Sequence, residues 1–224
     1  MTKFCAIIPA RQGSTRIKNK NLKNINGKPL IYWTIKEAKK SKYLNSIIVS
    51  TDSKSIKKFC LKNKVNVPFL RPKKLSNEKS SMHSVLKHAH NYLKNNDQHF
   101  DFYVLLQPTS PLRTVEDIDS ACKIIDKKNF DSLVSVVKLK KYMSPVLVYT
   151  SKNMQTLQSF NKKDKKKSGI FYSRNGAAIY ITKVKNVMNY ILGGRLGFYL
   201  MPSSRSVDID EQDDFLMAEK LLKN

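Results

Sequence analysis

The strongest chemical signal in the sequence is a basic loop that directly follows a short apolar run near residue 1. The loop spans Pro9–Asn21, reads PARQGSTRIKNKN, and holds the cations Arg11, Arg16, Lys18 and Lys20. Gly13 and Ser14 lie at its bend, where backbone N–H groups can point at phosphate oxygens while the cations neutralise phosphate charge. Neither GxxxxGK[ST] nor GxGxxG is present. A position at the end of a strand favours phosphate binding over a solvated basic turn.

A second candidate loop reads LLQPTSPLR over Leu105–Arg113. Its two prolines restrict the backbone. The polar side chains that it presents in a small space are Gln107, Thr109, Ser110 and Arg113. The loop is interpreted equally well as part of a binding site or as a rigid turn that caps the next helix.

The third signal is a pair of carboxylates in SVDID, Ser206–Asp210. In an extended segment Asp208 and Asp210 face the same side, and two carboxylates so placed suit a hard cation such as Mg²⁺ together with substrate phosphates. The alternative is that Asp210 is the N-cap of the last helix and Asp208 a surface residue, which the pattern alone slightly favours.

These loops require elements that position them, and the chain alternates apolar strands with amphipathic helices. Strands are predicted at Phe4–Pro9, Ser46–Ser50, Phe102–Leu106 and Ser132–Val137, and a short strand interrupted by Pro68 is predicted at Val65–Leu70. Helices are predicted at Pro29–Lys40, Ser53–Asn63, Ser80–Lys94 and Val115–Lys127. Five βα units with continuous apolar strands predict an α/β fold in which a mostly parallel sheet is covered on both faces. Ligands bind such sheets beyond the carboxyl ends of the strands, which is where the candidate loops lie.

The alternation breaks after Lys138. Strands are predicted at Pro145–Tyr149, Ala177–Ile181 and Gly197–Met201, a polar loop at Lys152–Ser168, and a final helix at Asp210–Leu222. We therefore expect one domain over residues 1–224, in which residues 138–200 contain a small inserted arm.

Composition narrows the function classes. The 224 residues carry 42 Lys and Arg against 17 Asp and Glu, a formal net charge of +25. Only seven of the cations are Arg and the Lys are diffuse, apart from a run at Lys162–Lys167, so the charge indicates a solvated surface more than a nucleic-acid interface. Three widely spaced Cys without CxxC spacing argue against a zinc ribbon or a disulfide framework and are typical of the cytoplasm. The first residues contain too short an apolar run for a signal peptide or membrane span.

Taken together, the motifs resemble one family, the acylneuraminate cytidylyltransferases. The matching segments, in order, are Pro9–Ser14 with Lys20-Asn21, Ser50–Asp52, Arg71-Pro72, Leu106–Arg113, Arg174–Gly176 and Ser206–Asp210. The resemblance runs from residue 4 to about residue 222. It implies a Rossmann-like α/β nucleotidyltransferase core with a small arm that mediates a homodimer. It also implies transfer of CMP from CTP to the anomeric hydroxyl of a nine-carbon 2-keto-3-deoxy acidic sugar, with release of pyrophosphate and with Mg²⁺ (or Mn²⁺) as cofactor.

The resemblance implies roles for individual residues. The residues expected to bind the nucleotide are Arg11, Gly13, Ser14, Lys20, Asn21, Arg71 and Ser81, the last two at the cytosine base. Asp208 and Asp210 match the metal-binding pair. Arg11, Lys20 and Asp210 are the expected catalytic residues, with Asp210 assisting deprotonation of the sugar hydroxyl directly or through water. The residues expected to position the sugar are Gln107, Thr109, Ser110, Arg174 and Asn175, with Arg174 on the carboxylate.

Some residues depart from the family pattern. Ser144-Pro145 is followed by Val146 and Leu147 where sialic acid members carry a Lys after His-Pro. Residues 173–178 read SRNGAA where RPNGA is frequent, and Glu78 stands where an Asp is common. These departures leave the identity of the sugar open between sialic, legionaminic and related 5-acylamino sugars. The pseudaminic acid branch is disfavoured because its sugar-side motif is not found here.

Two alternatives remain. The CMP-Kdo synthetases are the nearest enzymes, but they carry an acidic residue in the loop occupied here by Gln107–Pro111. The other alternative is a non-enzymatic nucleic-acid-binding protein that uses the Lys-rich surface. It leaves Arg11, Gln107 and the Asp208/Asp210 pair without a role, so we expect no nucleic-acid partner.

Overall fold

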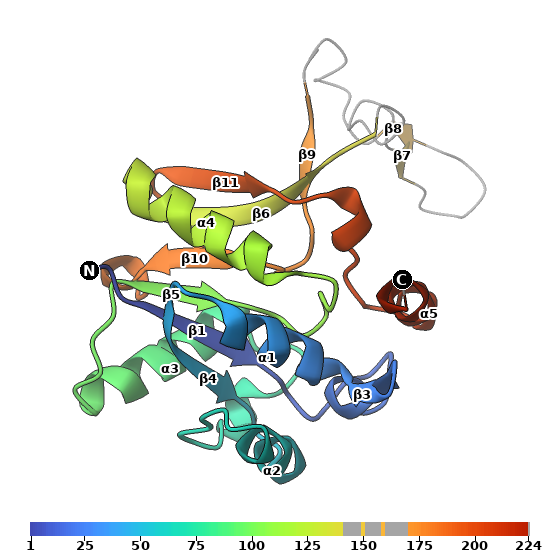
Figure 1. Cartoon of the computed structure of the whole chain (residues 1–224), viewed down its shortest axis with the longest axis horizontal. Coiled ribbons are helices and arrows are strands. Elements are labelled where there is room, and N and C mark those ends of the chain that lie inside the picture. The colour runs from blue at the N-terminus through green and yellow to red at the C-terminus, as the bar shows by residue number, and fades with distance from the viewer. Residues whose placement is uncertain (141–148, 151–157, 160–169, 224) are drawn as a thin grey trace.

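The computed structural model describes residues 1–140, 149–150, 158–159 and 170–223 (Figure 1). In the described part of the chain a seven-stranded mixed sheet has the order β11-β6-β10-β5-β1-β4, and β9 pairs with β6. Its strands are β1 Phe4–Pro9, β4 Leu44–Ser50, β5 Phe102–Leu105, β6 Ser132–Lys138, β9 Tyr172–Arg174, β10 Tyr180–Lys183 and β11 Leu196–Leu200. Two short pairs, β2 Asn24–Ile25 with β3 Lys28–Pro29 and β7 Tyr149–Thr150 with β8 Gln158–Ser159, lie outside it.

The pairing confirms a mostly parallel sheet with two antiparallel strands, β10 inside the sheet and β9, which pairs with β6. β4, β1 and β5 are parallel to one another, and β11 is parallel to β6. β10 lies between β5 and β6 and is antiparallel to both, although it follows them in the sequence by more than forty residues. β6 is therefore parallel to β5 without contacting it, so the sheet is complete only when β10 is in place.

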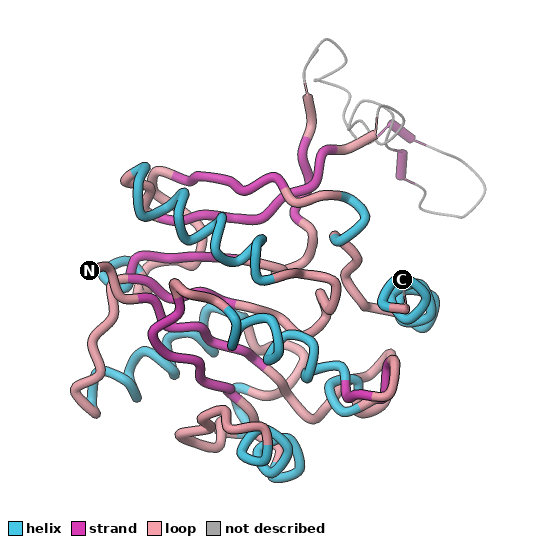
Figure 2. Tube along the Cα trace, in the orientation of Figure 1, coloured by secondary structure: helices cyan, strands magenta, loops and turns pink. Residues whose placement is uncertain are grey.

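Four of the five described helices cover the two faces of this sheet, and the last packs beyond the carboxyl end of β1 (Figure 2). The five are α1 Leu30–Lys40, α2 Lys54–Lys62, α3 Met82–Asn95, α4 Val115–Lys128 and α5 Gln212–Leu222. Alternate residues of β1 divide the core: Phe4, Ala6 and Ile8 pack with α1, α2 and α4. Cys5 and Ile7 pack with α3 on the opposite face. This two-sided burial is the reason β1 is apolar throughout.

A third, smaller cluster lies beyond the carboxyl end of β1. Ile17, Leu30 and Ile209 pack there against Phe215 and Ala218 of α5. In Figure 1, α5 and β3 lie on the side toward which β1 points. The cluster therefore fixes the basic loop and the Ser206–Asp210 segment against the same helix.

Several predicted elements need correction. The strand predicted at Val65–Leu70 is wrong: only the bridges Ile48↔Asn66 and Thr51↔Leu70 form, because Pro68 has no N–H to donate. Fewer than five complete βα units result. The strand predicted at Ala177–Ile181 is observed as Tyr180–Lys183, and the last helix begins two residues later than expected.

Part of the range 138–200, which was predicted to contain the arm, lies outside the described residues. The predictions that fall in this part are the Pro145–Tyr149 strand except Tyr149, the Lys152–Ser168 loop except Gln158–Ser159, and the Lys162–Lys167 run. Of the range 138–200, β9, β10 and β11 belong to the main sheet. Among the described helices, none is long and apolar enough to cross a membrane.

Candidate active site

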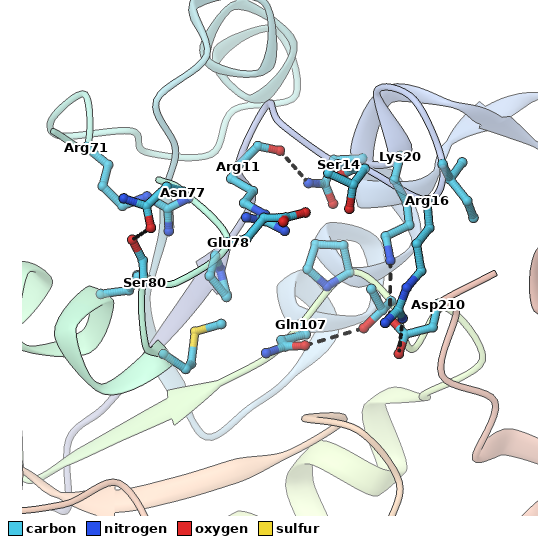
Figure 3. A pocket seen from close by; sticks show the side chains of 18 of the residues that line it. Arg11, Ser14, Arg16, Lys20, Arg71, Asn77, Glu78, Ser80, Gln107 and Asp210 are labelled. Carbon is cyan, nitrogen blue, oxygen red and sulfur yellow. Dashed lines mark hydrogen bonds and ion pairs between the residues drawn. The ribbon is translucent and has the colours of Figure 1, made fainter. Parts of the chain in front are cut away.

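A cavity of about 680 Å³ opens at the carboxyl ends of β1 and β5 (Figure 3). It brings together most of the residues that the sequence singled out, although they are distant in the chain. The predicted residues that line it are Arg11, Ser14, Lys20, Asn21, Arg71, Gln107, Thr109, Asp208 and Asp210. Gly13, Ser81, Ser110, Arg174 and Asn175 are not among its lining residues.

The basic loop is held in place by its own polar contacts. The Asn21 amide donates to the Arg11 carbonyl at 2.9 Å, and the Gln12 N–H donates to Asp52 Oδ1 at 2.9 Å. Asn21 is 7% exposed, so its side chain is committed to shaping the loop. These contacts leave the Arg11 side chain directed into the cavity (Figure 3).

At one end of the cavity Lys20 and Arg16 converge on Asp210. Lys20 Nζ donates to the Ile209 carbonyl at 2.6 Å and lies 3.6 Å from Asp210 Oδ1, while Arg16 Nη1 lies 3.2 Å from Asp210 Oδ2. Burial lowers the pKa of Lys20, and the carboxylates of Asp210 and Asp208 oppose that shift. A cluster of this kind suits a polyanion.

Asp208 is the most constrained carboxylate of the cavity. Burial raises its pKa, with the Thr109 hydroxyl acting in the opposite direction. Its Oδ1 atom is buried and has no hydrogen-bond partner in the described part of the chain. An unpaired buried carboxylate oxygen facing a second carboxylate is a fitting pair of ligands for a hard cation.

The described residues contain no group of three or more His, Cys, Asp and Glu side chains that could hold a metal. Asp208 and Asp210 would therefore need further oxygens from a bound substrate. Mg²⁺ is commonly held in this way, by one or two carboxylates plus substrate phosphates.

The opposite end of the cavity is built around Arg71. Arg71 is 5% exposed. Its side-chain Nε donates to Ser76 Oγ at 3.1 Å, and its backbone N–H donates to the Thr51 carbonyl at 2.7 Å. Burial lowers its pKa, and Asp52 opposes the shift. Ser81 caps α3 by accepting the Ser84 N–H at 3.1 Å, and the neighbouring Ser80 lines the cavity instead.

The Gln107–Thr109 loop lies between the two ends of the cavity, and Arg113 holds its backbone from the protein interior. The guanidinium of Arg113 is fully buried and donates to the carbonyls of Gln107 at 3.3 Å and Ala178 at 2.6 Å. Its other amino group donates to Thr34 Oγ1 at 2.7 Å. Burial lowers the pKa of Arg113 to about 10. The interpretation of this loop as a turn that leads into a helix is confirmed, because Thr114 caps α4. Gln107 and Thr109 also line the cavity, and their contact with a ligand stays a prediction.

Arg174 and Asn175 do not line the cavity, although Gly176, which follows them, lies against Asp208. Asn175 is 4% exposed; its Oδ1 accepts from Ser135 Oγ at 2.8 Å and its Nδ2 donates to Ser206 Oγ at 3.0 Å. Arg174 is exposed on β9 and lies near the Tyr180 hydroxyl. Their predicted contact with a sugar remains a prediction.

Sequence reasoning assigned no role to several residues that line the cavity. The polar ones are Thr15, Asn77 and Ser80, which follow no pattern that marks them. Arg16 also lines the cavity; the sequence names it among the loop cations but does not include it in the expected site. Glu78 lines the cavity as well, and the sequence marks it only as a departure from the family pattern.

The chain matches a protein-family model described as cytidylyltransferase over residues 5–224. It is 33% identical to CMP-N,N'-diacetyllegionaminic acid synthase of Legionella pneumophila, with 99% of this chain and 97% of that relative covered. It is 32% identical to N-acylneuraminate cytidylyltransferase of Escherichia coli over 97% of this chain, and it spans about half (51%) of the length of that relative. Pseudaminic acid cytidylyltransferase of Campylobacter jejuni is 29% identical, with 100% and 97% covered.

A solved structure of CMP:2-keto-3-deoxy-manno-octonic acid synthetase complexed with CTP has the same fold. The TM-score is 0.71 over 99% of both chains, at 17% sequence identity. This similarity confirms the nucleotidyltransferase-type α/β fold that the sequence predicts.

Proposed function

Because the chain belongs to the cytidylyltransferase family, we propose that it transfers CMP from CTP to the anomeric hydroxyl of a nine-carbon 2-keto-3-deoxy acidic sugar. The observation that carries the proposal is one cavity with cations and two carboxylates at one end and a buried arginine at the other. The first end suits a triphosphate and its metal, and the second suits a polar base.

In the reaction, the sugar hydroxyl oxygen attacks the α-phosphorus, the bond from that phosphorus to the β-phosphate bridge breaks, and pyrophosphate leaves. Arg11 and Lys20 neutralise charge on the α-phosphate and on the leaving pyrophosphate. Ser14 offers a hydroxyl donor to the phosphates and Gly13 a backbone N–H. Arg16 joins this set, since it already faces Asp210.

Asp208 and Asp210 would hold Mg²⁺ or Mn²⁺, whose bound charge would stabilise the negative charge that develops on the phosphates. Asp210 is also the proposed acceptor of the hydroxyl proton, directly or through water, because its side chain is 60% exposed and reaches the open part of the cavity. Binding of substrate displaces its present ion pairs with Arg16 and Lys20.

We assign the base to the Arg71 end and the sugar to the Gln107–Thr109 loop. Arg71, with Ser80 or Ser81, would pair with polar edges of cytosine, and a site built in this way rejects uracil. Gln107 and Thr109 lie between the two ends, with Ser110 behind them. Arg174 is the proposed partner of the sugar carboxylate, which requires its exposed side chain to turn toward the cavity.

Sialic and legionaminic acids are the sugars that we propose. The names of the relatives refer to acylneuraminic, diacetyllegionaminic and pseudaminic acids. Because their sequence identities to this chain all lie within 29–33%, these identities do not single out one sugar. The Kdo-type alternative is supported by fold similarity alone.

Further proposals concern the assembly and the location of the protein. The exposed apolar side chains of β9 and β11, among them Tyr172 and Phe198, support a homodimer. Cys5, Cys60 and Cys122 are free and buried, which agrees with a reducing cytoplasm.

The test is pyrophosphate release from CTP and Mg²⁺ with a panel of sialic, legionaminic, pseudaminic and Kdo sugars, scored by kcat/KM. We expect release with sialic or legionaminic acid and little with UTP in place of CTP. Release with Kdo alone would replace the proposed sugar. No release with any sugar, together with tight and salt-sensitive oligonucleotide binding, would replace the enzyme by the nucleic-acid-binding alternative.

A further inference from the structure

A buried carboxylate outside the cavity, that of Asp117, links two of its walls. Asp117 is fully buried at the third position of α4. It accepts hydrogen bonds from Arg205 Nε at 3.0 Å and Nη2 at 2.7 Å, and from the Tyr199 hydroxyl at 2.7 Å. It also accepts the Thr114 N–H at 3.0 Å.

The two sides of this network belong to different walls of the cavity. Thr114 ends the loop that carries Gln107 and Thr109, and Arg205 begins the segment that carries Asp208 and Asp210. A second tie lies nearby, because the Ile209 N–H donates to the Thr109 carbonyl at 2.8 Å. Asp208 is thus held between two fixed points, Arg205 and Ile209.

Stability alone is a weak reason for this arrangement. Taking a carboxylate out of water is costly, and a buried ion pair often contributes no more than an apolar pair of the same volume. Burial by itself would raise the pKa of Asp117, but the donors Arg205, Thr114 and Tyr199 outweigh burial and lower the pKa. Two parallel hydrogen bonds from one guanidinium to one carboxylate also fix the relative orientation of the two side chains.

We propose that Asp117, through Arg205, is a positioning residue that sets the separation and orientation of the Asp208/Asp210 pair and thereby its affinity for a divalent cation. The inference rests on the proposed role of those carboxylates. Removal of a group that hydrogen-bonds directly to a metal ligand typically weakens metal binding about 10–100-fold. Asp117 acts one step further out, through Arg205 and the backbone that leads to Asp208, so we expect the lower end of that range.

The test uses two variants and a matched control. Asp117→Asn removes the carboxylate charge, and Arg205→Lys removes one of the two hydrogen bonds that the guanidinium donates. Asp119→Asn is the control. Asp119 lies on the same helix, but its carboxylate accepts from Ser41, away from the cavity. Three quantities are measured for each: Mn²⁺ affinity by electron paramagnetic resonance with CTP present, Tm in EDTA, and the Mg²⁺ dependence of pyrophosphate release.

We expect Arg205→Lys and Asp117→Asn to weaken Mn²⁺ binding about tenfold or more, with a matching rise in the Mg²⁺ needed for half-maximal rate. At saturating Mg²⁺ the KM for CTP should stay within about twofold of wild type. Asp119→Asn should keep the Mn²⁺ affinity of wild type whatever its Tm. If Asp117→Asn does not fold, Arg205→Lys decides, since Arg205 is partly exposed.

Unchanged Mn²⁺ affinity in Arg205→Lys would reduce the network to a structural one and overturn the proposal. Absence of Mn²⁺ binding in wild type would overturn it as well. A different result would separate the two proposals: Mn²⁺ binds to wild type, binds more weakly to both variants, and no pyrophosphate is released with any sugar. This result would contradict the proposed reaction and support the positioning role.

Discussion

Asp208 combines a position suited to cation binding with an unfavourable environment for its own charge. Its Oδ1 atom is buried without a hydrogen-bond partner in the described part of the chain, and burial raises its pKa. A raised carboxyl pKa means that the folded state binds the proton more tightly than the unfolded state. The contribution of Asp208 to the stability of the metal-free protein is therefore fully present below about 3.9, the ordinary pKa of Asp, and is lost as pH rises through its raised pKa in the folded state.

Asp208→Asn is expected to stabilise the metal-free protein while it abolishes turnover. The gain at pH 7 should be about 2–4 °C in Tm, which is about 1 kcal/mol for a chain of this length. It should shrink as pH falls toward 4, because the wild-type carboxyl is then neutral as well. Thermal unfolding in EDTA across pH 4–8 measures this.

Asp210→Asn is the matched control for this stability effect. The Asp210 side chain is 60% exposed and is paired with Arg16 and Lys20, so its amide variant should gain no stability, although turnover is lost there too. A lower Tm for Asp208→Asn than for wild type at pH 7 would contradict the burial argument.

The residue scale also shows which site residues a sequence can reveal. Arg11, Lys20 and the Asp208/Asp210 pair were singled out by their charge, by their place in loops and by their match to the motifs of the family, and all four line one cavity. Asn175 was placed at the sugar because it lies beside Arg174 in a motif that matches the family, whereas in the structure its amide contacts Ser135 and Ser206. Only the three-dimensional partners of a polar side chain tell whether it is free for a ligand.

At the scale of the element, the turn between β9 and β10 lies directly against the carboxylate segment. Gly176 has a positive φ of +66°, and a Cβ atom built there would lie 2.4 Å from Cγ of Asp208. The backbone of this turn can approach Asp208 only because residue 176 has no side chain.

Gly176→Ala is therefore expected to displace Asp208 and to lower kcat/KM about 100-fold, since misplacement by about 1 Å near a reacting group can have this effect. Gly27→Ala is the matched control, because Gly27 has a similar φ of +75° with no atom within 4 Å of its Cβ position. Both variants should lose stability from backbone strain, and only Gly176→Ala should lose activity. Tm and pyrophosphate release measure the two effects separately. Equal activity in both would show that the close approach to Asp208 is unimportant.

Elements that depend on local pattern were predictable, and those that depend on distant pairing were not. The strand Phe4–Pro9 was predicted with its observed bounds, since six successive buried residues leave little alternative. The strand predicted around Pro68 failed for want of an N–H donor at that position. Nothing in the residues of β10 indicates that it separates β5 from β6, because that position is set by contacts across the sheet.

At the scale of the whole molecule, β11 is an edge strand with an apolar outer face. Leu196, Phe198 and Leu200 are 49%, 54% and 48% exposed, and the ring of Phe198 lies 5.4 Å from that of Tyr172 on β9. An edge strand of this kind is a site of association unless another surface covers it. A second copy of the chain, related by a two-fold axis, is the occupant that we propose.

Phe198→Asp should accordingly shift the protein from dimer to monomer, because a charge at the centre of the apolar face must be desolvated on association. Sedimentation equilibrium at several concentrations measures the change. Leu61→Asp is the control, since Leu61 is 52% exposed on α2, away from β11, and should leave the assembly unchanged. A wild type that sediments as a monomer, or a Phe198→Asp variant that remains a dimer, would remove this face from the interface.

The internal position of β10 has a consequence for synthesis of the chain. Until Tyr180–Lys183 has left the ribosome, β5 and β6 have no partner between them, although both precede it by more than forty residues. A nascent or truncated chain that ends before residue 180 therefore exposes two unpaired strand edges, which are templates for aggregation. The domain must fold late, and nonsense or frameshift products that end before β10 should be cleared by proteolysis or found in inclusion bodies.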